Sequence, residues 1–162
     1  MNRVAKFEKV SSTQFNSDLT TCGKNENCYE DIILPKRSSK YSAGYDFYAP
    51  YDFTVNINEK LVIASGVRCK IEGEYFLMLA PRSSLGFKYQ LGLANTVAII
   101  DADYYNTANE GHILISLVNR GDKPVSIKKG ERFCQGIFLN YAICIDDDND
   151  DVRTGGLGSS GL

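Results

Sequence analysis

Residues 99–104 have the sequence IIDADY, in which an apolar run that ends at Ile100 leads into two carboxylates, Asp101 and Asp103, and a tyrosine, Tyr104. Side chains on a strand alternate between its faces, so Asp101 and Asp103 should share one face and Tyr104 the other, until a turn redirects the chain. An ionised aspartate can orient a water molecule and accept its proton, which is general-base chemistry. Acids at a strand end can also be merely solvated. The segment makes Asp101 a candidate catalytic base.

An arginine and two serines stand at the end of a second apolar run. Residues 75–80 are YFLMLA and lead through Pro81 into Arg82, Ser83 and Ser84. Loops at strand ends commonly build binding sites, and a guanidinium offers a phosphate two parallel charge-assisted hydrogen bonds. The alternative is an arginine–serine turn with capping hydroxyls. The functional interpretation is a phosphate contact.

The C-terminal segment joins an acidic block to a glycine-rich tail. Residues 146–151, DDDNDD, carry like charges that keep such a block extended and solvated, so it should act as a linker. In the tail at 152–162, glycine N–H groups with Arg153 and Ser159 would wrap a polyphosphate, because unhindered backbone donors converge on anionic oxygens. The alternative is a disordered polar tail. We expect residues 146–162 to form a flexible arm that orders when it closes on an anionic ligand.

Short apolar runs punctuated by turns predict an all-β sandwich or barrel. Strands and helices do not alternate repeatedly, and 162 residues suit one domain with one core. We expect this domain over residues 1–145, with a polar insert at 11–31 that contains a short helix and carries no chemical signature. The expected strands are 4–10, 46–48, 53–57, 60–64, 67–71, 75–79 and 112–118.

Composition argues against several classes of function. A net charge of −2 without a clustered basic face argues against nucleic-acid binding. No apolar run is long enough to cross a bilayer, and the first residues lack the apolar region of a secretory signal, so we expect a cytoplasmic protein without membrane contact. Five cysteines and a sole histidine, His112, distant from all of them in sequence suggest neither a disulfide framework nor a zinc site. Free thiols are expected.

Five segments, taken in order, carry a family resemblance. They are AGYDFYA at 43–49, PRSSLG at 81–86, IIDADY at 99–104, GERFCQ at 130–135 and RTGGLGSSG at 153–161. From about residue 41 to the C-terminus the chain resembles the trimeric deoxyuridine triphosphatases. The resemblance implies a jelly roll of the β-clip type, a homotrimer with active sites at subunit interfaces, and Mg²⁺-dependent hydrolysis of dUTP to dUMP and pyrophosphate by water attack on the α-phosphorus. That activity would limit uracil incorporation into DNA and supply dUMP for thymidylate synthesis.

The resemblance also implies roles for individual residues. Asp101 would be the catalytic base, and Tyr104 would lie flat against the sugar and leave no room for a 2'-hydroxyl. Asp46 would hold a metal-bound water while the Mg²⁺ is held mainly by substrate phosphates. Arg132 would pair with an acid across a subunit contact. The other implied substrate-binding residues are Arg82, Ser83, Ser84, Asn95, Ile99, Ile100, Leu114, Gln135, Arg153, Leu157 and Ser159. Backbone groups within 95–104, a hairpin-like wall, would distinguish uracil from cytosine.

The chain departs from the family pattern at three places. Leu157 stands where an aromatic ring commonly stacks on uracil, Ala98 replaces a frequent glycine, and the turn at 106–111 is longer than usual. Two alternative functions stay open. A dCTP deaminase would need an acid/base group beside the base, and the wall at 95–101 contains no glutamate. A nucleotide-gated binding protein would not need Asp101.

Overall fold

The computed structural model describes residues 2–25, 28–149, 151 and 155. Its strands outnumber its helices, and every pairing among the described strands is antiparallel. The strands are β1 (Ala5–Lys9), β2 (Lys36–Arg37), β3 (Tyr45–Tyr48), β4 (Phe53–Val55), β5 (Lys60–Ala64), β6 (Val67–Ile71), β7 (Tyr75–Pro81), β8 (Leu91–Leu93), β9 (Ala98–Ile100), β10 (Leu114–Asn119), β11 (Val125–Ile127) and β12 (Arg132–Asn140). The helices are α1 (Ser12–Thr21), α2 (Ser83–Tyr89) and the 3-10 helix η1 (Ala102–Asn106). The prediction of an all-β jelly roll is confirmed.

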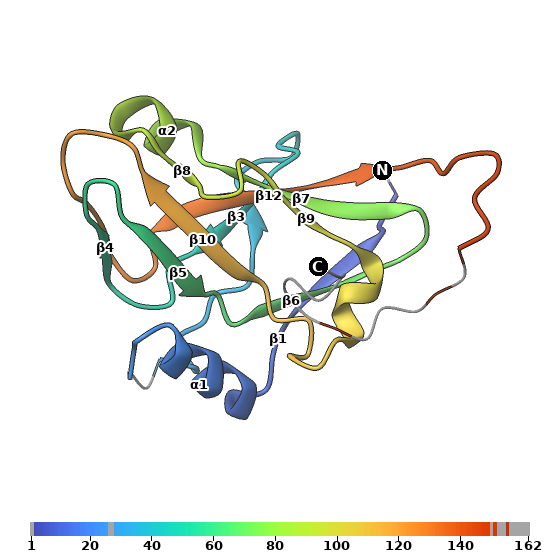
Figure 1. Ribbon diagram of the computed structural model, residues 1–162, viewed down its shortest axis with the longest axis horizontal. Coiled ribbons are helices and arrows are strands. Elements are labelled where there is room, and N and C mark those ends of the chain that lie inside the picture. Colours follow the sequence, from blue (N-terminus) through green and yellow to red (C-terminus); the bar gives the residue numbers. More distant parts are fainter. Residues whose placement is uncertain (1, 26–27, 150, 152–154, 156–162) are drawn as a thin grey trace.

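The strands form two larger sheets and two pairs. One sheet has the order β2-β3-β12-β7-β9 and the other β5-β10-β8, while β1 pairs with β6 and β4 with β11. The inward side chains of these sheets, such as Phe47, Leu79 and Leu117, belong to one buried cluster. Figure 1 shows α2 at the upper side and α1 at the lower side of the molecule, with η1 beside the start of β10. One core therefore supports the whole domain.

The observed strands follow the hydrophobic pattern with local differences. β5 and β6 have the expected bounds, and buried Ile115 and Leu117 alternate along β10 as predicted. This strand begins at Leu114 rather than at His112, because the N–H of His112 donates to the carbonyl of Asn109 in a turn. Four strands were not among the expected ones: β2, β8, β11 and the long strand β12. For β2, β8 and β11 the reason is that runs of two or three residues carry too little periodicity.

The helix α2 is a correction, because the sequence predicted only a loop after Arg82. Its seven residues include Gly86 and two aromatic residues, which are weak helix formers. Buried Leu85 anchors it, and Gln90, in the left-handed conformation, caps its end by donating its N–H to the Gly86 carbonyl. Packing therefore overrides local propensity here.

Helix α1 occupies the polar insert. The Ser11 hydroxyl caps it by accepting from the Gln14 N–H at 3.1 Å. Phe15 and Leu19, four residues apart, are buried and attach this face to the core. Within the described residues no helix is long and apolar enough to cross a membrane.

All five cysteines are free thiols, as the sequence predicted. Burial raises the pKa of Cys69 and of Cys134 to about 12 each. These two thiols are therefore packing groups rather than nucleophiles.

Candidate active site

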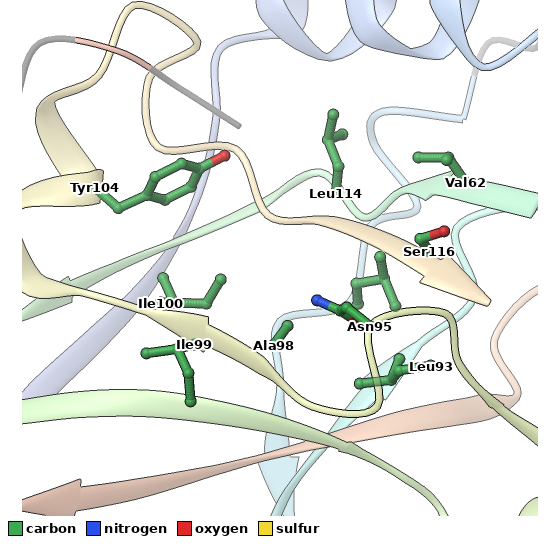
Figure 2. A pocket seen from close by; sticks show the side chains of 10 residues that line it. Val62, Leu93, Asn95, Ala98, Ile99, Ile100, Tyr104, Leu114 and Ser116 are labelled. Carbon is green, nitrogen blue, oxygen red and sulfur yellow. The ribbon is translucent and has the colours of Figure 1, made fainter. Parts of the chain in front are cut away.

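A pocket of about 220 Å³ lies between the edge strand β9 and strand β10 (Figure 2). Figure 2 shows Tyr104 at one end of it and Leu93 and Ser116 at the other. The lining residues are Val62, Leu93, Asn95, Ala98, Ile99, Ile100, Tyr104, Leu114, Ile115 and Ser116. Five of the residues proposed from the sequence therefore meet in one pocket.

Four further lining residues were missed as site residues: Val62, Leu93, Ile115 and Ser116. Val62 and Ser116 are register partners on β5 and β10. Ser116 shares its face of β10 with Leu114, the face opposite to buried Ile115. The alternation of side chains along β10 could have identified Ser116 from the sequence. Val62 could not be identified in this way, because it reaches the pocket through the pairing of β5 with β10.

The wall at residues 95–104 is not a hairpin, which corrects the sequence-based expectation. β8 pairs with β10 and β9 with β7, so the turn between β8 and β9 joins two different sheets. β9 is the last described strand of its sheet, so sheet pairing uses the backbone groups of one side only. The outer N–H and C=O groups of an edge strand can pair with another partner.

Tyr104 is held rigidly at the end of the pocket. It is 5% exposed, and its hydroxyl donates to the His112 carbonyl at 2.8 Å. The same hydroxyl accepts from Nδ2 of Asn109 at 3.0 Å. Because its phenol oxygen is engaged by the protein, the ring offers the pocket a face rather than a hydrogen-bonding group.

Asp101 follows the pocket residue Ile100 and stands at the N-cap of η1. The strand ends at Ile100, so the predicted alternation does not continue to Asp103. The Tyr104 N–H donates to the Asp101 carbonyl at 3.2 Å, and this bond begins the 3-10 helix η1. Tyr104 is the buried residue of this helix. Both aspartates are exposed, and Asp101 directly follows the lining residue Ile100 without being a lining residue itself.

A second group of the proposed residues surrounds Asp46, which is 9% exposed. Its Oδ2 accepts from Nη1 of Arg132 at 3.2 Å, and its Oδ1 forms an ion pair with Nε of Arg82 at 3.2 Å. Nη1 of Arg82 also donates to the Arg132 carbonyl at 3.2 Å. Gln135 is the register partner of Asp46, and its Nε2 donates to the Pro81 carbonyl at 3.2 Å. Two guanidinium groups and one carboxylate leave this group with a net positive charge.

A β-bulge in β12 sets the direction of Arg132. The register against β3 shifts between Arg132 and Cys134, so Phe133 and Cys134 are both buried although they are neighbours. Arg132 was expected to pair across a subunit contact, but here it pairs with Asp46 of its own chain. A pocket of about 380 Å³ beside this pair is lined by Tyr48, Arg82, Leu85, Ile127, Gly130, Glu131 and Arg132.

Ser83 and Ser84 form the first turn of α2 next to Arg82, and both are exposed. The two pockets share no lining residue, so the structure does not bring the group around Asp101 together with the group around Arg82 in one chain. The proposed tail residues Arg153, Leu157 and Ser159 lie outside the described residues.

The described residues contain no group of three or more His, Cys, Asp or Glu side chains that could cage a metal ion. Both oxygens of Asp46 already face guanidinium groups. This donor set suits Mg²⁺ that arrives on phosphate oxygens and retains water ligands, which is the usual mode for this ion. An Mg²⁺ ion carried by a nucleotide therefore fits the residues present.

Comparison with known proteins agrees with this arrangement. A family model described as dUTPase matches residues 30–161. The deoxyuridine 5'-triphosphate nucleotidohydrolase of Lactococcus lactis is 40% identical over 133 residues, which cover 80% of this chain and 89% of that protein. The protein of the same name from swinepox virus is 32% identical over 139 residues, covering 82% and 92%.

Solved structures share the fold. The crystal structure of dUTPase from Streptococcus mutans is similar with a TM-score of 0.68 at 30% identity, covering 85% of this chain and 97% of that chain. A mutant dUTPase of Staphylococcus bacteriophage 80alpha with dUpNHpp has a TM-score of 0.66 at 18% identity, covering 94% and 100%. Since the family model spans most of the chain and the fold that builds the pocket recurs in these structures, the chain belongs to the dUTPase family.

Proposed function

We propose that this chain hydrolyses dUTP to dUMP and pyrophosphate, with Asp101 orienting the attacking water at a site shared between protomers. The observation that carries the proposal is a small pocket with a hydrogen-bonded tyrosine ring at its end and an exposed carboxylate, Asp101, on the residue that follows its lining residue Ile100. The family membership of the chain supports the same activity.

The pocket suits a nucleoside rather than a whole nucleotide. Its volume of about 220 Å³ is below the range of ~300–1,000 Å³ that is typical of pockets for drug-sized ligands. A uracil base would pair its edge with the outer backbone groups of β9 and the amide of Asn95. A cytosine would present the wrong donor pattern there and leave buried polar groups unsatisfied, a cost of ~1–3 kcal/mol per group.

The sugar would lie against the face of Tyr104. Hydrogen bonds of the Tyr104 hydroxyl with Asn109 and with the His112 carbonyl restrict movement of the ring away from the sugar. A ribose 2'-hydroxyl would meet this face without a hydrogen-bond partner, so the site would favour deoxyribose.

Asp101 would take a proton from water as it attacks the α-phosphorus in line with the departing pyrophosphate. A general base contributes roughly 10²–10⁴ in rate, whereas enzymes commonly exceed accelerations of ~10⁶. Neutralisation of the developing phosphate charge must supply the remainder. We assign that role to Arg82, Ser83, Ser84, Gln135 and, from the arm, Arg153 with Ser159.

Mg²⁺ would add charge neutralisation at the phosphates when bound with the substrate. Asp46 is the protein group that would contact one of its water ligands. To do so an Asp46 oxygen would be shared with Arg82 or Arg132, which now hold it. Leu157 of the arm would cover the base with apolar area.

The separation of the two pockets supports a homotrimer with shared sites. Residues beside the first pocket are apolar and exposed, namely Ile99 at 49%, Val97 at 42% and Val62 at 39%. Apolar groups gathered at a surface often mark a protein interface. We propose that a neighbouring protomer covers these apolar residues and brings its own Arg82 and Gln135 close to Asp101 of the first protomer. We also propose that each protomer consists of a domain at residues 1–145 and an arm at residues 146–162.

Incubation with Mg²⁺ and either dUTP or dCTP tests this function against its alternatives. Pyrophosphate and dUMP should appear from dUTP, with dCTP left intact. Ammonia release from dCTP would indicate a deaminase, and tight dUTP binding without turnover would indicate a gated binding protein. Either of these results would refute the proposal.

A further inference from the structure

The sole histidine of the chain is fully buried and makes two defined hydrogen bonds. Nε2 of His112 accepts from the Gly66 N–H at 2.8 Å, and Nδ1 lies 2.5 Å from Oδ2 of Asp18. A nitrogen that accepts from an N–H cannot itself carry a proton. The imidazole is therefore neutral, with its proton on Nδ1 and donated to Asp18. Burial lowers the pKa of His112, which agrees with a neutral ring.

Asp18 belongs to α1, so this bond ties the polar insert to the turn that follows Tyr104. A second tie lies beside it, because Glu110 accepts from the N–H of Ser11 at 2.7 Å and from its hydroxyl at 2.6 Å. The longer turn at 106–111 and the insert at 11–31, to which the sequence assigned no function, are therefore joined by hydrogen bonds.

The turn is a tight one. Glu110 and Gly111 have positive φ angles of 58° and 69°. A Cβ atom on Gly111 would lie 2.7 Å from the Tyr105 Cα and 2.9 Å from the Tyr104 carbonyl. This close approach brings the His112 carbonyl to the Tyr104 hydroxyl.

The contacts form a continuous path from α1 to the pocket. Asp18 holds the His112 ring, the His112 carbonyl accepts from the Tyr104 hydroxyl at 2.8 Å, and Tyr104 lines the pocket. Asn109 Nδ2 bridges the same two groups, donating to the Tyr104 hydroxyl at 3.0 Å and to the His112 carbonyl at 3.3 Å.

We propose that His112, held by Asp18 of the insert, is a positioning residue that fixes the Tyr104 ring and thereby sets the discrimination between deoxyribose and ribose nucleotides. The inference rests on the proposed function, since it assigns a purpose to the ring face at the same site. It also gives the insert at 11–31 a part in substrate selection.

A purely structural role for His112 predicts a different result. Its ring also packs near Phe15, with centroids 6.2 Å apart, so its loss would lower stability in any case. The test must therefore separate selectivity from stability. Phe53 provides the matched control: it is 4% exposed and packs on Phe133 and Tyr51, and it lines neither pocket.

The experiment compares steady-state hydrolysis of dUTP and UTP by His112→Phe, Asp18→Ala and Phe53→Leu, with Tm measured for each. His112→Phe keeps a ring but removes both hydrogen bonds. Asp18→Ala leaves the histidine in place and carries the test if His112→Phe does not fold. In both variants we expect the KM for dUTP to rise, kcat for dUTP to change little, and the ratio of kcat/KM for dUTP over UTP to fall about five- to tenfold. Phe53→Leu should lower Tm and leave that ratio unchanged.

A double variant sharpens the assignment. Tyr104→Phe removes the hydroxyl that His112 holds, so adding His112→Phe to it should reduce selectivity no further. Wild-type selectivity in both His112→Phe and Asp18→Ala, or an equal loss of selectivity in Phe53→Leu, would overturn the inference. Failure of the unaltered chain to cleave dUTP would instead refute the proposed function itself, before any variant is compared.

Discussion

Among single residues, Asp101 is the one to which we assign the general-base role, and its place in the chain is the basis of that assignment. It is exposed, it stands at the N-cap of η1, and it directly follows the pocket-lining residue Ile100. Asp103 is also exposed, and unlike Asp101 it does not directly follow a lining residue of either pocket, so the two acids form a natural comparison.

Replacing Asp101 with Asn should lower kcat for dUTP by about 10²–10⁴, because the amide cannot accept the proton of the attacking water. Binding of a non-hydrolysable dUTP analogue should stay within a few-fold of the parent chain. Asp103→Asn, the same change two residues along, should retain activity. Near-normal kcat in Asp101→Asn would remove the role assigned to this carboxylate.

The buried His112 predicts how stability depends on pH. Its pKa is lowered in the folded chain, chiefly by burial, from the ordinary value of 6.5. As pH falls below that value the unfolded chain binds a proton that the native chain does not, so the free energy of unfolding decreases, by at most about 1.4 kcal/mol per pH unit. Hydrogen bonds from Ser11 lower the pKa of the neighbouring Glu110 from 4.5, so its contribution is lost only at more acidic pH.

Urea unfolding at pH 7.5 and 5.5 measures this dependence. The parent chain should lose stability between the two values, and His112→Phe should lose much less. A pH-independent midpoint in the parent chain would mean that His112 titrates alike in both states.

At the scale of elements, turns and irregularities place the site residues. The bulge in β12 directs Arg132 to Asp46, and the end of β9 at Ile100 places Asp101 at the N-cap of η1. The turn before β10 holds the Tyr104 hydroxyl through the His112 carbonyl. The regular strands form the sheets, while the bulge, the strand end and the turn determine where these three side chains lie.

Gly111→Ala tests the turn, with Gly73→Ala as its control. Both glycines have positive φ, 69° and 64°, but only a Cβ on Gly111 would meet backbone, since nothing lies within 4 Å of one on Gly73. Gly73→Ala should cost about 1–2 kcal/mol of unfolding free energy. Gly111→Ala should cost about 1–3 kcal/mol more and also raise the KM for dUTP. Equal effects of the two changes on Tm and on KM would contradict the close approach at Gly111.

At the scale of the whole molecule, the separation of the two pockets within one chain predicts that only the homotrimer, and not a single protomer, is active. Arg82 and Asp101 line or adjoin different pockets, so each site would take them from different protomers.

Co-refolding inactive Asp101→Asn with inactive Arg82→Ala should therefore recover part of the activity, because mixed trimers contain some sites with both intact residues. Each variant refolded alone provides the control. If the mixture is as inactive as its components, the two residues belong to one protomer's site.

Removing residues 153–162 should lower turnover of dUTP about 10-fold or more, since the Arg153 guanidinium and the glycine N–H groups would no longer bind the triphosphate. The Tm should change little, because the described core lies before residue 146. Arg153→Ala in the full chain should reproduce a large part of the loss. A truncated chain with undiminished kcat and KM would show that the arm has no part in turnover.

The sequence by itself determined the all-β class, most strand positions, the free thiols and the residue types that meet in the first pocket. The class and the strands follow from alternation, which is a local property of the chain, whereas the pocket residues were implied by the family resemblance of five ordered segments. Asn95, Ile100 and Tyr104 were predicted together and do line one pocket.

Only the tertiary structure decided which distant residues meet. Asp18 and His112 are 94 positions apart, Val62 joins the pocket through its pairing with Ser116, and α2 forms because Leu85 finds a place in the core. Such contacts depend on how loops and sheet edges pack against each other, and a pattern read along the chain carries no record of that packing.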